Sequence, residues 1–113
     1  MSKIIIVEGK TDKERLLEIL DEPVEIICTH GTLGYQELEE LASSYQYDDV
    51  FVLVDADDAG AKLRTQLNKE MPNLHHLYTR KMYREVATTP LEHLAEVLER
   101  AHFQVRQKSL PLE

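Results

Sequence analysis

The chain has 113 residues, 42% of them hydrophobic and 30% charged, which is the composition of one globular domain with a single core. Its formal net charge of −8 argues against a domain that grips long duplex nucleic acid through a basic surface, so we expect any nucleic-acid contact to be local, assisted by a metal ion or completed by a protein partner. No apolar run reaches the ~20 residues that span a bilayer, the N-terminus lacks a signal-peptide pattern, and the single Cys28 excludes an internal disulfide and a cysteine-built metal site, so we predict a cytoplasmic protein with no membrane partner.

The first half of the chain alternates predicted strands and helices. Residues 3–7 predict a buried strand, because four β-branched residues follow Lys3. A capping box over residues 11–14 predicts a helix starting at Thr11 and ending before Pro23, with three leucines facing inward: Leu16, Leu17 and Leu20. Residues 24–28 predict a second strand, and a loop containing Gly31 follows it.

The second half continues this alternation. We expect a helix over 35–44, an entirely apolar and therefore central strand over 50–54, and a helix from Asp58 or Ala59 to Met71. A weaker strand over 74–78 is followed by a second capping box, Thr89-Pro90-Leu91-Glu92, and by a helix that buries Leu91, Leu94, Ala95 and Leu98. Residues 103–113 are predicted to be an edge strand or a flexible tail.

This order of elements predicts an α/β fold, a three-layer sandwich whose central, mainly parallel sheet of four strands is flanked by helices, in one domain over residues 1–113. Functional sites of such sheets form beyond the carboxyl ends of the strands. The residues after the four predicted strands, whose last members are Val7, Cys28, Val54 and Tyr78, are therefore the place to look for a site.

Acidic residues follow two of these strands. Glu8 comes directly after the first strand, and Asp55 and Asp57 come after the third. If the two strands are neighbours, these carboxylates lie close together, and two carboxylates ~4 Å apart repel by about 4 kcal/mol at an effective dielectric constant of 20. Protonation, a basic partner or a divalent cation relieves such repulsion. Oxygen-only ligands favour Mg²⁺ or Mn²⁺, so we predict a metal site formed by Glu8, Asp55 and Asp57.

Two motifs carry a resemblance to a known family. Glu8-Gly9-x-x-Asp12 and Asp55-x-Asp57-x-x-Gly60, each after an apolar strand, resemble the signature motifs of the Toprim family, which includes catalytic domains of bacterial primases, topoisomerases and nucleases. The sequence is most similar to the Toprim half of the ribonuclease that matures the smallest bacterial ribosomal RNA. That similarity covers roughly residues 3 to 98 and extends to three further segments: His30-Gly31-Thr32, Gly60-Ala61-Lys62-Leu63-Arg64 and Leu91-Glu92-His93-Leu94.

The resemblance implies a Toprim-like, Rossmann-like fold and a division of labour in the acidic cluster. Glu8 would transfer protons or bind a second ion, while Asp55 and Asp57 would hold Mg²⁺. We expect Asp12 to be mainly structural, because its charge suits the first turn of a helix. Eight further residues near the predicted rim are candidate contacts for phosphate or substrate: Gly9, Lys10, Gly31, Gly60, Arg64, Arg80, Lys81 and Arg84.

Three functions remain open at this point. The first is a Mg²⁺-dependent nuclease or phosphotransferase that acts on RNA or single-stranded nucleic acid. The second is a non-catalytic module that binds nucleic acid or a protein partner through the same site. The third is a phosphoacceptor receiver domain, which the sequence disfavours because only one acidic residue follows the first strand and only four strands are clear.

Overall fold

A computed structural model of the protein describes residues 2–106. In this part of the chain four parallel strands form one sheet in the order β2-β1-β3-β4: β1 (Lys3–Val7), β2 (Glu25–Cys28), β3 (Asp49–Val52) and β4 (His75–His76). The two strands that precede the acidic motifs, β1 and β3, are neighbours at the centre of the sheet. The predicted parallel α/β sheet is therefore confirmed.

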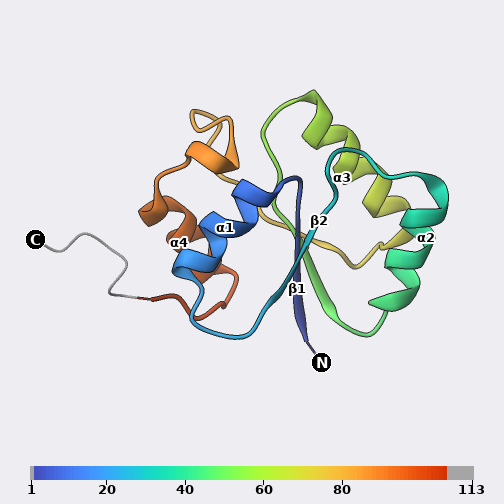
Figure 1. The fold of residues 1–113 in the computed structure, drawn as a ribbon, viewed down its shortest axis with the longest axis horizontal. Helices are drawn as coiled ribbons and strands as arrows, with labels where there is room; N and C mark the ends of the chain where they lie inside the picture. Colours follow the sequence, from blue (N-terminus) through green and yellow to red (C-terminus); the bar gives the residue numbers. More distant parts are fainter. Residues whose placement is uncertain (1, 107–113) are drawn as a thin grey trace, which may run out of the picture.

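Helices cover both faces of the sheet (Figure 1). Helices α1 (Lys10–Ile19) and α4 (Leu91–Arg100) lie on one side, and α2 (Tyr35–Ser44) and α3 (Asp58–Glu70) lie on the other. A single 3₁₀ turn, η1 (Val86–Thr88), connects β4 to α4. The arrangement is the three-layer sandwich that the alternation of strands and helices predicts.

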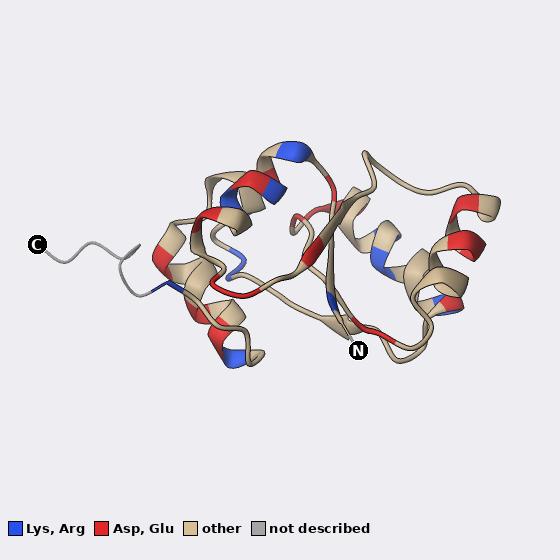
Figure 2. Cartoon of the chain, turned by 60° about the horizontal axis from the view of Figure 1, so that its bottom comes forward, with Lys and Arg blue, Asp and Glu red and all other residues tan. Residues whose placement is uncertain are grey.

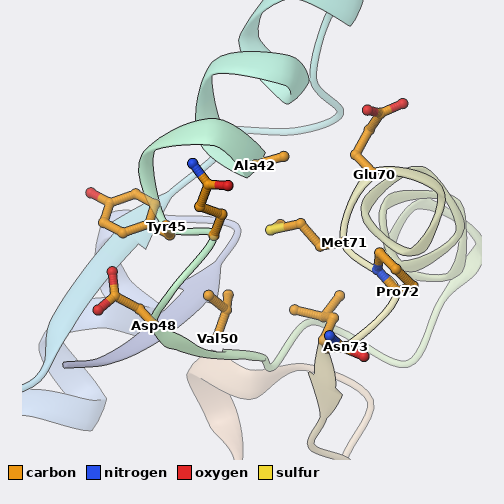
Figure 3. Close-up of a pocket in the computed structure, with 10 residues that line it drawn as sticks. Ala42, Tyr45, Asp48, Val50, Glu70, Met71, Pro72 and Asn73 are labelled. Atoms are coloured by element: carbon orange, nitrogen blue, oxygen red, sulfur yellow. The ribbon is translucent and has the colours of Figure 1, made fainter. Parts of the chain in front are cut away.

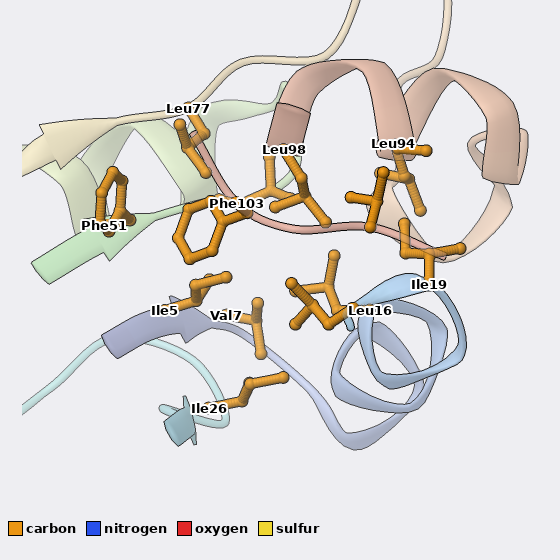
Figure 4. Close-up of a cluster of buried hydrophobic side chains, with 14 of the residues drawn as sticks. Ile5, Val7, Leu16, Ile19, Ile26, Phe51, Leu77, Leu94, Leu98 and Phe103 are labelled. Atoms are coloured by element: carbon orange, nitrogen blue, oxygen red, sulfur yellow. The ribbon is translucent and has the colours of Figure 1, made fainter. Parts of the chain in front are cut away.

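The side chains of β1 alternate between two hydrophobic clusters, because successive residues of a strand point to opposite faces. Ile5 and Val7 join the cluster under α1 and α4, which also contains Phe51, Leu98 and Phe103 (Figure 4). The other face carries residues of β1, β3 and α3 in a second cluster, whose members include Ile4, Ile6, Val52, Leu63 and Leu67. A core on each face fixes the central strands and hence the positions of the residues that follow them.

Several predicted boundaries are wrong. Helix α1 begins at Lys10 with Gly9 as its N-cap instead of at Thr11, and the side chain of Leu17 is 47% exposed. Strand β3 ends at Val52, although Leu53 and Val54 are buried, and β4 has two residues instead of five. Tertiary packing sets these boundaries, which local sequence patterns specify only weakly.

The predicted capping box at the start of α4 is also wrong. Pro90 is the N-cap, and the hydroxyl of the buried Thr89 donates to the carbonyl of Glu85 (2.7 Å) instead of capping the helix. The predicted edge strand at the C-terminus is reduced to one antiparallel bridge between Leu20 and Val105, beside the end of α1. The last seven residues of the predicted tail, 107–113, lie outside the described residues.

Charge is distributed unevenly over the molecule (Figure 2). Acidic residues appear on all sides, with clusters on α2 and α4, whereas basic residues are fewer and scattered. Because charge is spread in this way, the local contacts at the acidic rim of the sheet, and not the net charge, decide what the rim can bind.

No helix in residues 2–106 has the length and apolar character needed to cross a membrane.

Candidate functional site

Glu8 and Asp55 meet at the carboxyl ends of the two central strands. The backbone N–H of Asp55 donates to Oε1 of Glu8 (3.1 Å), just beyond the last inter-strand bond, in which Leu53 N–H donates to the carbonyl of Ile6 (3.0 Å). The glutamate that follows β1 thus points toward the loop that follows β3. Its geometry is set by the parallel register of two buried strands, so the two motifs are held together by the core.

The carboxylate of Asp55 is fixed by the segment that precedes α4. Val86 N–H donates to Oδ1 of Asp55 (2.8 Å), and Ala56 N–H donates to the carbonyl of Arg84 (2.8 Å). These two bonds bring the loop after β4 against the loop after β3. The backbone of Arg84 therefore lies beside the acidic rim.

Asp57 is the N-cap of α3. Its Oδ1 accepts the N–H of Gly60 (2.8 Å), which satisfies one of the free amides in the first turn. Gly60 itself packs against the backbone: a Cβ atom there would lie 2.1 Å from the carbonyl oxygen of Asp55. A side chain at Gly60 would therefore displace the backbone of Asp55.

Asp12 is the fourth carboxylate of this region and is only 7% exposed. It accepts the N–H of Gly9 (3.1 Å) at the start of α1, so its structural role is confirmed. Gly9 has φ −135° and ψ 170°, an extended conformation that any residue can adopt, so the backbone at this position does not itself require glycine.

Burial and mutual repulsion shift the titration of two of these groups. Burial raises the pKa of Glu8, and the charges of Asp55, Asp57 and Asp12 raise it further, while the hydrogen bond from the Asp55 amide opposes the shift. Burial likewise raises the pKa of Asp12, with contributions from Asp55 and Glu85. The four carboxylates are therefore close enough to repel one another, and within residues 2–106 none forms an ion pair with a basic side chain.

The oxygens of the cluster suit a hard cation. Glu8, Asp55 and Asp57 each use one carboxylate oxygen to accept a backbone N–H, and in the described part of the chain the second oxygen accepts no hydrogen bond. These free oxygens match the ligand preference of Mg²⁺, which binds through one or two carboxylates and keeps several waters. Among residues 2–106, however, no three His, Cys, Asp or Glu side chains are placed so that they could hold a metal ion together, so a bound ion would need water or substrate to complete its ligands.

A hollow of about 730 Å³ opens beside the two aspartates of the second motif. Its lining includes Asp55 and Asp57 from the loop after β3, Arg64 from α3, and Tyr78 and Lys81 from the segment after β4. This volume is in the range of small-molecule binding sites. The hollow thus joins predicted acidic and basic site residues with one aromatic side chain, Tyr78, that was not predicted as a site residue.

The other predicted phosphate contacts surround this rim. Lys10, Arg80 and Arg84 are exposed, and no described acidic side chain forms an ion pair with them. Gly31, with φ +110°, lies in the loop after β2, which is tied to the first motif because His30 N–H donates to the carbonyl of Glu8 (2.7 Å). The structure therefore brings this loop to the same rim as the acidic residues.

Arg64 is held more tightly than the sequence indicates. Its Nη2 donates to the carbonyl of Leu77 (2.7 Å), its Nη1 lies 3.0 Å from Nδ1 of His76, and its Cζ lies 4.1 Å from the ring centroid of Tyr78. Burial lowers the pKa of Arg64, while Tyr78 and Glu8 oppose that shift. The guanidinium therefore already has partners in β4 and the residues just beyond it.

A second hollow lies far from the acidic motifs (Figure 3). Its volume is about 170 Å³, and it lies at the amino ends of β3 and β4, where its lining includes Tyr45, Asp48, Val50, Met71 and Asn73. None of the predicted site residues belongs to it. The candidate site is therefore the rim at the carboxyl ends of the strands.

Two participants were missed by sequence reasoning. Val86 contributes only a backbone amide, which leaves no pattern in the sequence. Tyr78 could have been found, because it ends the predicted fourth strand at the edge where sites form, and its side chain is 63% exposed.

Comparisons with known proteins agree with this geometry. The profile of the family described as Toprim domain matches residues 3–87, which include both acidic motifs. The solved structure described as a small TOPRIM domain protein from Bacillus stearothermophilus superimposes with a TM-score of 0.94 at 50% identity, covering 100% of this chain and 96% of that one. The resemblance drawn from the two motifs is therefore confirmed.

Two relatives match this chain over different shares of their own length. "Uncharacterized protein YusF" of Bacillus subtilis (strain 168) is 49% identical over 105 residues, which are 93% of this chain and 72% of that protein. Ribonuclease M5 of Mycoplasma genitalium is 33% identical over 76 residues, which are 66% of this chain but only 42% of the ribonuclease. The similarity to the ribonuclease thus concerns less than half of that protein.

Proposed function

The chain belongs to the Toprim domain family, and from this premise we propose that its acidic rim performs Mg²⁺- or Mn²⁺-dependent phosphodiester chemistry on nucleic acid. The observation that carries the proposal is the convergence of Glu8 and Asp55, joined by the hydrogen bond from the Asp55 amide to Glu8, with Asp57 close by. RNA or single-stranded nucleic acid is the proposed substrate, since one of the relatives is a ribonuclease.

The side chains divide the work according to their environments. Asp55 and Asp57 would hold the ion through the oxygens that their backbone hydrogen bonds leave free. Glu8 would bind or release a proton near the reacting phosphate. Burial and the neighbouring carboxylates raise its pKa above the ordinary value of 4.5, which favours its protonated form. When bound, the metal ion supplies positive charge at the phosphate and an activated water.

The basic residues around the rim would position the phosphate backbone. Lys10 is the first residue of α1, and Arg80, Lys81 and Arg84 lie in the segment between β4 and η1; all four are exposed. The backbone at Gly31 would allow close approach from the side of β2. Few such contacts are expected at a net charge of −8, so binding would be local and weakened by salt.

A cleavage assay tests this function directly. Purified protein is incubated with single-stranded RNA and DNA in Mg²⁺, in Mn²⁺ and in chelator, together with Glu8→Gln, Asp55→Asn and the control Glu40→Gln, which changes an exposed acid on α2. We expect divalent-dependent cleavage that Glu8→Gln and Asp55→Asn reduce at least a hundredfold and that Glu40→Gln retains. Cleavage that survives in both rim variants would contradict the proposal.

A binding module without catalysis is the second candidate. It is favoured by the net charge of −8 and by the finding that, among the described residues, no three carboxylate, His or Cys side chains are placed to hold a metal ion together. In this case the protein would bind an oligonucleotide or a protein partner in the presence of Mg²⁺ without cutting it. Metal-dependent cleavage that is lost in the rim variants would exclude this candidate.

A further inference from the structure

Tyr78 is an exposed aromatic residue on a rigid support. Its side chain is 63% exposed, yet the Arg64 guanidinium lies over its ring, with Cζ 4.1 Å from the ring centroid. One face of the ring is thus occupied by a cation while the side chain as a whole stays accessible to solvent.

A chain of three side chains holds this support in place. The guanidinium of Arg64 can only donate, so Nδ1 of His76 accepts its hydrogen bond (3.0 Å), and Nε2 of His76 then carries the proton and donates to Oδ1 of Asn68 (2.9 Å). The Leu77 carbonyl accepts a further bond from Arg64 (2.7 Å). The guanidinium that lies against the Tyr78 ring is therefore held in place before any ligand arrives, and a support that is already ordered reduces the entropy lost on binding.

The location of the ring relates it to the acidic rim. Tyr78 lines the same hollow of about 730 Å³ as Asp55, Asp57 and Lys81. A ligand in this hollow would meet carboxylates that suit a metal ion, one lysine that suits a phosphate, and one aromatic surface. One nucleotide suits all three contacts. Its phosphate can bind a metal ion and the lysine, and its base can stack on the aromatic ring.

The net charge of the protein favours a contact of this kind. At −8, long-range attraction for a polyanion is weak, so contacts that do not depend on charge should add to the affinity that the few local phosphate contacts supply. Stacking of a base on an aromatic ring is such a contact, and it selects unpaired bases because paired bases are buried in their own stack.

We propose that Tyr78, supported by Arg64, is a stacking platform for one unpaired base of a single-stranded substrate whose phosphate lies at the acidic rim. This inference rests on the proposed function and adds to it a specific contact, in which Tyr78 binds one base of the single-stranded substrate. Tyr78 is a binding residue here and takes no part in bond cleavage. Arg64 is a positioning residue that acts through the ring.

The test compares bases and side chains together. Short single-stranded oligonucleotides, intact or with one base replaced by an abasic site that is moved along the strand, are titrated into the wild-type protein without divalent ion and then with Mg²⁺. At one position the abasic site should weaken binding to the wild type by about tenfold. Tyr78→Leu should bind both oligonucleotides with the same weakened affinity, and Tyr78→Phe should behave as the wild type does.

Tyr47→Leu is the matched control, because Tyr47 is also exposed, at 76%, and lies outside the hollow. It should retain the discrimination between intact and abasic strands. If Tyr78→Leu weakens both strands by the same factor, or if the wild type shows no discrimination at any position, the platform is disproved. A contact between Tyr78 and a protein partner would give the same negative result.

The same titration separates this inference from the proposed function. Failure of the metal chemistry would appear as equal affinity and equal cleavage in wild type and Asp55→Asn with Mg²⁺. Stacking on Tyr78 needs no metal ion, so the dependence on the base would persist in chelator even then. Loss of base discrimination together with retained metal-dependent cleavage would overturn the platform alone.

Discussion

In the loop after β1 a glycine precedes the aspartate by three residues, and in the loop after β3 the order is reversed. Gly9 is the N-cap of α1 and donates its N–H to Asp12 in the first turn, whereas Asp57 is the N-cap of α3 and accepts the N–H of Gly60 in the first turn. Each loop therefore closes the start of a helix with one carboxylate and one glycine amide.

The two glycines nevertheless answer to different constraints. A Cβ at Gly9 would have Asp12 Oδ2 at 3.7 Å as its nearest neighbour, an ordinary contact, while a Cβ at Gly60 would lie 2.1 Å from the Asp55 carbonyl oxygen. Similar motifs can thus hold glycine for unlike reasons. In the first motif the buried Asp12 accepts the N–H of the N-cap residue Gly9. In the second motif Gly60 permits α3 to approach the acidic loop.

The largest effect should come from Gly60→Ala, which would force the backbone of Asp55 away from α3. We expect the free energy of unfolding to fall by about 3 kcal/mol, or Tm by roughly 10 °C, despite the better helix propensity of alanine. Urea and thermal denaturation would measure the loss. A Gly60→Ala protein as stable as the wild type would show that the two motifs do not differ as described.

A smaller loss is expected for Asp57→Ala. Removing the N-cap oxygen should cost about 1 kcal/mol without divalent ion, while Asp57→Asn, which keeps an oxygen acceptor for Gly60 N–H, should cost far less. In thermal melts with Mg²⁺, both variants should lose the stabilisation that the ion gives the wild type. If Asp57→Asn retains that stabilisation, Asp57 is a cap and not a ligand.

Glu8→Gln should act in the opposite direction. Burial and neighbouring carboxylates raise the pKa of Glu8 above its ordinary value of 4.5, so the folded state binds this proton more tightly than the unfolded chain. The resulting stabilisation is complete below pH 4.5 and is lost as the pH rises through the folded-state pKa. In chelator at neutral pH the variant should therefore have a higher Tm than the wild type.

The pH dependence supplies the control for this prediction. The difference in Tm between Glu8→Gln and the wild type should shrink as the pH falls toward 4.5, and addition of Mg²⁺ should stabilise only the wild type. The exposed Glu40→Gln should show neither behaviour. A lower Tm for Glu8→Gln throughout the pH range would mean that Glu8 stabilises the fold instead of straining it.

The smallest effect is expected for Gly9→Ala. The extended backbone at Gly9 accepts alanine, and the described atom nearest to the new Cβ lies 3.7 Å away, so the free energy of unfolding should change by less than about 0.5 kcal/mol. Denaturant unfolding of Gly9→Ala and Gly60→Ala, measured in parallel, would compare the free energies of unfolding of the two variants. Equal losses would contradict the proposed difference between the two motifs.

The rim of the sheet could be predicted from sequence because it depends on strong signals. The apolar runs of β1 and β3 identify buried parallel strands, and the carboxyl ends of such strands share an edge, so Glu8 and Asp55 were expected near each other. The helix starts depended on weaker signals. Thr11 matched a capping pattern, but the buried Asp12 reaches back to Gly9 and begins the helix earlier.

Other features could not be predicted because they join segments that are distant in the chain. The bond from Val86 N–H to Asp55 links residues 31 apart, and the contact of Arg64 with Tyr78 depends on where β4 lies beside α3. The close approach of Gly60 to the Asp55 carbonyl is local in the chain, but it depends on the angle at which α3 leaves the loop. Tertiary packing sets these distances, and no local pattern records them.

The central claim is that both acidic motifs share one divalent ion at the rim of the sheet. Its most direct test is an NMR titration with Mn²⁺, whose unpaired electrons broaden the signals of nearby amides. We predict broadening in both loops, at residues 8–12 and 55–60, that Mg²⁺ reverses by competition and Asp55→Asn abolishes. Broadening confined to one loop, or to the acidic face of α2, would contradict the account.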